Sequence, residues 1–313
     1  MIMSINTTDT DKQANLPDWT DKPVLFYGAR KSGTTMALNL MDGGDEMFVS
    51  PAEIKLKKFF RMKWSGKISD KIQYFEESTI LGWEYDNFDM EAYVDYVQEQ
   101  ENAGSLKSLI QKDLYNQYLA LKKKPSHPKL CAIKEVGGET DAIFNLFEKL
   151  FPQGRRVMIL RDPFMVTRSV LKNRQRRGIK ISFWQYFKQT RDPLVILANQ
   201  SKYMDQANIF FMAYEALTDK NKRQAVQENL CHYLSISWSD KFNTTSEFGV
   251  ESVSRTSSEN TAEVFVKKKK WYEGLVISER IMVASVHWLV RLELLMTGRY
   301  RGLKKSLNFI KNA

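Results

Sequence analysis

The sequence has little cysteine and histidine, and this scarcity argues against a disulfide framework and against a metal site. Its 313 residues include two cysteines and three histidines. Cys131 and Cys231 lie far apart in apolar segments, as buried and reduced thiols of intracellular proteins do. No metal-ligand spacing and no neighbouring cysteine pair accompany the histidines His127, His232 and His287. We therefore predict free thiols and no metal site.

Long apolar runs, a secretory signal and internal repeats are also missing. No run approaches the length of a bilayer span. Residues 1–21 are polar, without the basic-then-apolar order of a signal peptide. We expect 1–21 to be a loose tail, 22–313 to form one domain, and the compartment to be the cytoplasm. The formal charge of +10 favours anionic partners, and no nucleic-acid-binding motif accompanies it.

One stretch, Val24–Thr35, has the layout of an anion-binding corner. An apolar, aromatic run predicts a buried strand, a basic loop follows between Gly28 and Gly33, and Met36–Met41 is typical of a helix. Backbone N–H groups in such a loop and first helical turn have no intrahelical partners, so an anion can accept their hydrogen bonds. The stretch is not a Walker A motif, because Thr34 follows Gly33 where that motif needs lysine. An ordinary strand–turn–helix corner explains these residues equally well.

Strands and helices alternate along most of the chain. Apolar runs predict strands at 24–27, 47–50, 130–135, 156–161 and 208–214. A helical period predicts helices at 36–41, 140–150, 163–177, 221–234 and 278–297. Residues 61–128 interrupt this order with an aromatic-rich, mostly helical segment. The pattern predicts an α/β fold, a P-loop-type three-layer α/β/α arrangement with a central, mainly parallel sheet and a helical insertion.

Charged side chains follow most of the predicted strands. In a parallel sheet, ligands bind beyond the carboxyl ends of the strands. The residues at those ends are Arg30, Lys31, Glu53, Lys134, Glu135, Arg161 and Tyr214. Arg161 and Ser169, eight positions apart, are spaced to hold one phosphate together. The alternative is an arginine that caps a neighbouring helix and a serine bonded to its own helix backbone.

Two of these motifs resemble those of sulfotransferases that use 3′-phosphoadenosine 5′-phosphosulfate (PAPS). Gly28–Thr35 resembles the loop that binds the 5′-phosphosulfate, and Arg161-Asp162-Pro163 with Ser169 is similar to the 3′-phosphate motif. Ser50–Lys55 looks like the segment with the catalytic glutamate in the heparan 3-O-sulfotransferase and tyrosylprotein sulfotransferase branches. The resemblance runs from about residue 23 to residue 300 and is weakest through the 61–128 segment.

The resemblance implies a PAPS-dependent sulfotransferase that acts on a hydroxyl, with a carbohydrate or glycoconjugate acceptor by analogy. It implies Glu53 as the general base, Lys31 as the residue that stabilises the leaving 5′-phosphate, and Lys134 as a partner of the sulfuryl oxygens or the acceptor. The residues implied in PAPS binding are Arg30, Lys31, Ser32, Gly33, Thr34, Thr35, Arg161, Ser169, Tyr214, Ser257 (or Ser258) and Lys270. No metal is required, because lysines and N–H groups neutralise the transferred group. Acceptor specificity is expected in 61–128.

The sequence departs from that family at two places. Val136 stands where the phenol and steroid branch carries a catalytic histidine, and the Lys267–Lys270 run only loosely replaces that branch's Arg-Lys-Gly motif. Glu135 is the rival base, ranked second because neighbouring strand residues point to opposite faces. Two other classes stay open: a P-loop kinase, which needs ATP and Mg²⁺, and a non-enzymatic polyanion-binding protein.

Overall fold

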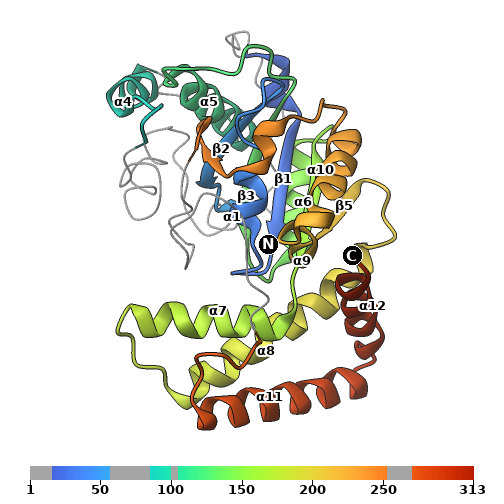
Figure 1. The fold of residues 1–313 in the computed structure, drawn as a ribbon. Coiled ribbons are helices and arrows are strands. Elements are labelled where there is room, and N and C mark those ends of the chain that lie inside the picture. Colours follow the sequence, from blue (N-terminus) through green and yellow to red (C-terminus); the bar gives the residue numbers. More distant parts are fainter. Residues whose placement is uncertain (1–15, 57–84, 100–104, 252–269) are drawn as a thin grey trace.

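The computed structural model describes residues 16–56, 85–99, 105–251 and 270–313. Five strands form its central sheet (Figure 1). In spatial order they are β2 (Met47–Glu53), β3 (Leu130–Val136), β1 (Pro23–Gly28), β4 (Arg155–Leu160) and β5 (Ile209–Ala213), and every pairing between them is parallel. This arrangement confirms the predicted α/β class and parallel sheet.

Strand β1 lies at the centre of the sheet, and every residue in it is buried. Its side chains alternate between two apolar cores, as the period of a strand requires. Leu25 and Tyr27 belong to one core, whereas Val24 and Phe26 belong to the other. A strand buried on both faces explains the unbroken apolar run in the sequence. The two cores separate the three layers of the fold.

Helices cover both faces of the sheet. In chain order, the helices of the described residues are α1 (Thr34–Asn39), α4 (Met90–Glu99), α5 (Leu106–Leu119), α6 (Thr140–Leu150), α7 (Pro163–Arg176), α8 (Phe183–Gln200), α9 (Tyr214–Leu217), α10 (Lys220–Leu234), α11 (Ile277–Met296) and α12 (Tyr300–Asn312). Helices α1 and α10 pack on the core of Val24, and α5 and α6 pack on the core of Leu25. A short hairpin, β6 (Ser246–Glu247) and β7 (Val250–Glu251), lies apart from the sheet.

The start of α7 follows from three adjacent residues. Asp162 caps the helix by accepting hydrogen bonds from the backbone N–H groups of Phe164 (2.9 Å) and Met165 (3.1 Å). Pro163 occupies the first helical position, where its missing N–H costs nothing. This local chemistry fixes the end of β4 and the entry into α7, and so fixes the place of Arg161 between them.

The boundary of the predicted N-terminal tail differs from the structure. The expected loose tail reached Asp21, but Asp18–Asp21 forms a 3-10 turn. Trp19 in that turn is buried against Phe48 and Tyr118, with ring centroids 5.6 and 5.3 Å away. The chain is therefore anchored before residue 22, because a buried tryptophan removes a large apolar surface from water.

The described part of the 61–128 segment consists of α4 and α5. Helix α5 belongs to the main core, where Leu109 and Leu114 are buried. Ser50 on β2 donates a hydrogen bond of 2.7 Å to Gln117 on α5. Residues 57–84 and 100–104 lie outside the described residues. Within the described part, α5 therefore forms a layer over the sheet.

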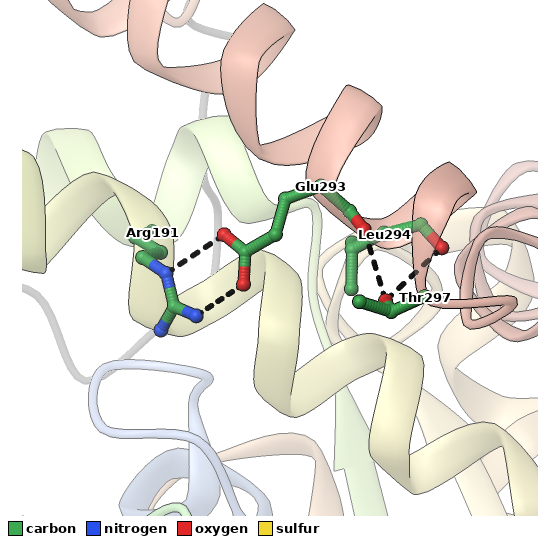
Figure 2. Close-up of polar contacts among 4 residues, drawn as sticks. All are labelled: Arg191, Glu293, Leu294 and Thr297. Carbon is green, nitrogen blue, oxygen red and sulfur yellow. Dashed lines mark hydrogen bonds and ion pairs between the residues drawn. The ribbon is translucent and has the colours of Figure 1, made fainter.

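Helices α7, α8 and α11 lie together below the sheet in Figure 1. Arg191 on α8 makes a two-pronged ion pair with Glu293 on α11, with 3.1 Å between its Nε and one carboxylate oxygen (Figure 2). The hydroxyl of Thr297 takes no part in that ion pair. It donates a hydrogen bond of 2.9 Å to the backbone carbonyl of Glu293 and so closes the end of α11. Helices α8 and α12 were not among the predicted elements. Helix α8 is not predicted from the sequence because Pro193 lies in its interior, and a proline inside a helix usually ends or kinks it.

Candidate active site

The loop after β1 turns back over the end of the sheet. Lys31 and Gly33 both have left-handed backbone angles, with φ of 68° and 98°. The N–H of Ser32 donates to the Ala29 carbonyl at 2.9 Å, and its hydroxyl lies 3.1 Å from that of Thr34. A Cβ at Gly28 would stand 2.4 Å from the Ser32 hydroxyl oxygen. The loop is therefore compact and tolerates no side chain at Gly28.

Residues from three strand ends meet at this loop. Arg161, after β4, donates a hydrogen bond of 2.8 Å from Nη1 to the Lys31 carbonyl. Its guanidinium carbon lies 3.8 Å from the ring centroid of Tyr214, which follows β5. The same ring covers Gly33, where a Cβ would stand 2.1 Å from the Tyr214 Cδ2 atom. Tyr214 therefore supports both the loop and Arg161 from beneath, and the Nε of Arg161 is buried without a hydrogen-bond partner.

Several arginines surround Lys31 in the loop with positive charge. The pKa of Lys31 is lowered, first by burial and then by the charges of Arg30, Arg176, Arg177 and Arg161. Mutual repulsion of this kind disfavours the protonated lysine until an anion arrives. Arg176 and Arg177, at the end of α7, were not among the predicted site residues. Their effect on the pKa of Lys31 depends on where α7 lies relative to the loop, and the spacing of residues in the sequence does not predict that position.

Lys134 lies beside the loop on the neighbouring strand β3. The side chain is 7% exposed, and its Nζ donates to the hydroxyl of Thr35 at 3.3 Å. Burial lowers the pKa of Lys134 to about 8, and the carboxylates of Glu53 and Glu247 oppose that shift. Glu53 is the register partner of Lys134 across β2 and β3, next to an irregularity between Val49 and Glu53. The sheet thus brings the predicted base and the predicted lysine together.

The rival carboxylate Glu135 points into the other core. It follows Lys134 directly on β3, so its side chain leaves the opposite face of the sheet. Its carboxylate accepts a hydrogen bond from the backbone N–H of Leu56. Glu135 is buried, and its charge contributes to the raised pKa of Tyr27. These contacts describe a structural carboxylate on the side away from Lys134.

The remaining predicted phosphate contacts lie on α7 and in the C-terminal part of the chain. Ser169 is half-buried on α7, and its predicted phosphate contact stays a prediction. Lys270 is exposed, and its backbone N–H donates to the Glu273 carboxylate at 3.0 Å. The Glu273 carbonyl in turn accepts a hydrogen bond of 2.9 Å from Arg168 on α7. Ser257, Ser258 and Lys267–Lys269 lie outside the described residues.

The hairpin β6–β7 supplies a residue that sequence reasoning missed. Glu247 is buried and accepts a hydrogen bond of 3.2 Å from the side-chain amide of Asn39 on α1. The turn of the hairpin is held by Asp42, whose carboxylate accepts from the Gly249 N–H at 2.6 Å. Burial raises the pKa of Asp42 to about 6. Glu247 stands in a Ser- and Thr-rich stretch that read as a loop, so no signal marked it.

Three further observations concern the described residues alone. Both cysteines are free and buried, as predicted. Within these ranges no group of three or more histidine, cysteine or acidic side chains is arranged to hold a metal ion. None of the helices in the described part is long and apolar enough to cross a membrane.

Together, the parallel sheet and the cationic loop at its edge define an anion-binding α/β protein. The sequence matches the model of the sulfotransferase family over residues 23–240. That match covers well over half of the chain, and the protein belongs to this family. The match favours a sulfotransferase over the kinase and polyanion-binding alternatives. Comparison with curated proteins gives no significant match.

Solved structures share the architecture at low sequence identity. The sulfotransferase domain of the Synechococcus PCC 7002 olefin synthase is 16% identical, with a TM-score of 0.52 over 88% of this chain and 98% of that one. The sulfotransferase domain of the curacin biosynthetic pathway is 14% identical, with a TM-score of 0.49 over 85% and 98%. Retinol dehydratase in a complex with retinol and PAP is 13% identical, with a TM-score of 0.42 over 88% and 83%. The olefin synthase domain supports the assigned fold.

Proposed function

We propose that this protein transfers the sulfuryl group of PAPS to a hydroxyl, with Glu53 as the general base. The observation that carries the proposal is the meeting of the β1 loop, Arg161 and the Glu53–Lys134 pair at one edge of the sheet. An anion cradle beside a paired lysine and carboxylate is what in-line transfer to a hydroxyl needs.

The chain's own residues fit the two anionic ends of such a nucleotide. Arg30, Ser32, Gly33, Thr34 and Thr35 would cradle the 5′-phosphate, because the loop presents backbone N–H groups and admits close approach. Lys31 would stabilise the charge that develops on the leaving phosphate oxygen. The arginines around this loop make the site positive, and a bound phosphate would neutralise that charge.

Arg161 and Ser169 would hold the 3′-phosphate. The fixed orientation of the guanidinium, between the Lys31 carbonyl and the Tyr214 ring, supports this role. The unpaired Nε of Arg161 supports it as well, because a buried donor without an acceptor is costly. Tyr214 would act through Arg161 and Gly33. Ser257 and Lys270 would complete the phosphate contacts from the C-terminal part.

Lys134 and Glu53 would serve the reacting centre. The acceptor oxygen forms its bond to sulfur as the bridging sulfur–oxygen bond breaks, and the bond's electron pair leaves with the 5′-phosphate. Glu53 takes the hydroxyl proton, and Lys134 offsets the charge of the sulfuryl oxygens. Both residues stand at one register position of β2 and β3, which supports joint action. We expect no metal in this step, since the chain supplies the cations itself.

For the acceptor we propose a carbohydrate or glycoconjugate hydroxyl, selected by residues 61–128. The proposal rests on the likeness of the Ser50–Lys55 segment to the glutamate-bearing branches. We place the reaction in the cytoplasm, since free, buried thiols suit a reducing compartment. Screening candidate acceptors with labelled PAPS tests the acceptor class directly, and transfer to non-sugar hydroxyls alone would contradict it.

The nucleotide assignment is tested by thermal shift. Adenosine 3′,5′-bisphosphate should raise the melting temperature without Mg²⁺, and ATP should raise it much less. No shift with the bisphosphate would refute the assignment. Glu53→Gln should keep that shift and lower transfer by roughly 10² or more, whereas Glu135→Gln should keep most of the transfer activity if it still folds. Normal turnover in Glu53→Gln would remove Glu53 as the base.

A further inference from the structure

Helix α11 presents large apolar side chains to solvent along its whole length. Exposed fractions reach 73% for Ile277, 62% for Trp288 and 81% for Met296. The other exposed residues of this helix are small, hydroxylated or apolar, and none is charged. A protein surface seldom carries so long an apolar strip without a binding role. We call the strip the α11 face; it consists of Ile277, Ile281, Trp288, Leu292, Leu295 and Met296.

The charged residues of α11 turn toward the protein. Glu293 pairs with Arg191 on α8, as Figure 2 shows. Glu279 is buried and accepts hydrogen bonds from Gln175 (2.9 Å) and Tyr186. This orientation reverses that of an ordinary surface helix, whose charged side faces water. The inner side of α11 carries the buried Val283, Val286, Val290 and Leu294. The helix is therefore apolar on both sides, as an element covered on both sides is.

The spacing along the α11 face is that of packed helices. Ile281, Trp288 and Leu295 follow one another at intervals of seven, and Ile277 and Ala284 occupy the intervening row. Such a repeat keeps one stripe facing a partner helix. The middle of the stripe is small, because Ala284 and Ser285 lie between the large residues Ile281 and Trp288. A partner helix can approach closely there.

We propose that the α11 face is a homodimer interface, on which the α11 of a second copy packs antiparallel about a two-fold axis near Val286. In that register Trp288 lies opposite Ala284, and Ile277 lies opposite Leu295, so a large side chain meets a small one and apolar ends meet apolar ends. Ile281 lies opposite the half-buried Arg291. An isologous contact of this kind uses the same patch on both copies.

The area of the α11 face fits a second copy, and no exposed side chain of α11 is charged. The six side chains of the α11 face are 36–81% exposed. Together they offer on the order of 800 Å², which is about what each partner contributes to a standard interface. Each copy has a net charge of +10, but the exposed residues of α11 carry no charge, so no like charges repel one another across the α11 face itself. Helices that bind a lipid surface carry lysine and arginine beside the apolar side, and the exposed residues of α11 include neither.

Sedimentation velocity on the full chain tests the interface. The wild type should sediment as a dimer at micromolar concentration, and Trp288→Glu should weaken the dimer by more than about 100-fold. Trp184→Glu is the matched control, because Trp184 is even more exposed, at 74%, but lies on α8. It should remain a dimer. A monomeric wild type, or equal dissociation in both variants, would overturn the proposal.

Cross-linking tests the antiparallel arrangement. At 1.5 Å per residue, the two copies of position 285 would be offset by about 3 Å along the helices and those of position 278 by about 24 Å. Ser285→Cys should therefore give a covalent dimer with a short bismaleimide, whereas Ser278→Cys should not. The natural cysteines are buried and provide the background. Equal cross-linking at both positions would overturn the antiparallel register. Binding of a monomeric wild type to phosphatidylcholine–phosphatidylserine vesicles, lost in Trp288→Glu, would assign the face to a membrane instead.

Discussion

Arg161→Ala offers the sharpest test of the nucleotide site, because Arg161 has two separable contacts there. Its hydrogen bond to the Lys31 carbonyl shapes the loop, and its Nε, which is buried without a hydrogen-bond partner, belongs to the contact proposed for the 3′-phosphate. The first contact is worth about 1 kcal/mol and the second, to a charged group, about 2 kcal/mol. The variant should therefore bind adenosine 3′,5′-bisphosphate about 150-fold more weakly, since each 1.4 kcal/mol is a factor of ten.

Adenosine 5′-phosphate separates the two contributions. It lacks the 3′-phosphate, so Arg161→Ala should lose only about 5-fold in its affinity, the part due to the loop contact. Isothermal titration calorimetry without Mg²⁺ measures both ligands. Arg174→Ala is the control for lost charge on α7, because Arg174 donates to Gln185 at 3.2 Å. Equal losses for the two ligands would refute the 3′-phosphate role and leave Arg161 as a support of the loop.

Three further expectations follow from local geometry and charge. Transfer should fall as pH rises through about 8, because Lys134 then loses the proton that offsets the sulfuryl charge, and a pH–rate profile measures this. Gly33→Ala should lower the free energy of unfolding by about 2 kcal/mol more than Gly298→Ala, since both have positive φ but only the Gly33 Cβ would strike Tyr214; equal losses in denaturant unfolding would contradict that clash. Asp42 has a pKa raised from 3.8 to about 6, so its native state binds more protons and stability should fall by up to about 3 kcal/mol between pH 4 and pH 6. Asp42→Asn should remove that decline in urea unfolding, and an unchanged decline would assign it to other groups.

The parallel sheet and the β1 loop were predictable because each rests on local sequence. Strand β1 is buried on both sides and so reads as an unbroken apolar run, and Pro163 marks the start of α7. Helix α8 was missed because its interior Pro193 contradicts the local rule, and tertiary packing against α11 and α12 outweighs that penalty. Trp19 was assigned to a tail because only its tertiary contacts anchor it.

The site was predictable where it lies at strand ends and unpredictable where it depends on distant segments. Lys31, Arg161 and Tyr214 follow β1, β4 and β5, so the parallel topology alone brings them to one edge. The charge of Glu247 acts on Lys134 because the hairpin is held beside α1 by its hydrogen bonds to Asn39 and Asp42. No sequence period encodes such a contact, since it joins residues more than a hundred positions apart.

The two carboxylates near Lys134 are suited to different tasks. In the proposed reaction Glu53 accepts a proton, so at that moment Lys134 loses the larger of its two favourable charge interactions. Burial alone would then favour a neutral lysine, just as the sulfuryl oxygens need its charge. Glu247, fixed by Asn39 on the other side, supplies a negative charge that does not depend on the proton at Glu53. We infer that the hairpin keeps Lys134 charged while Glu53 acts as the base.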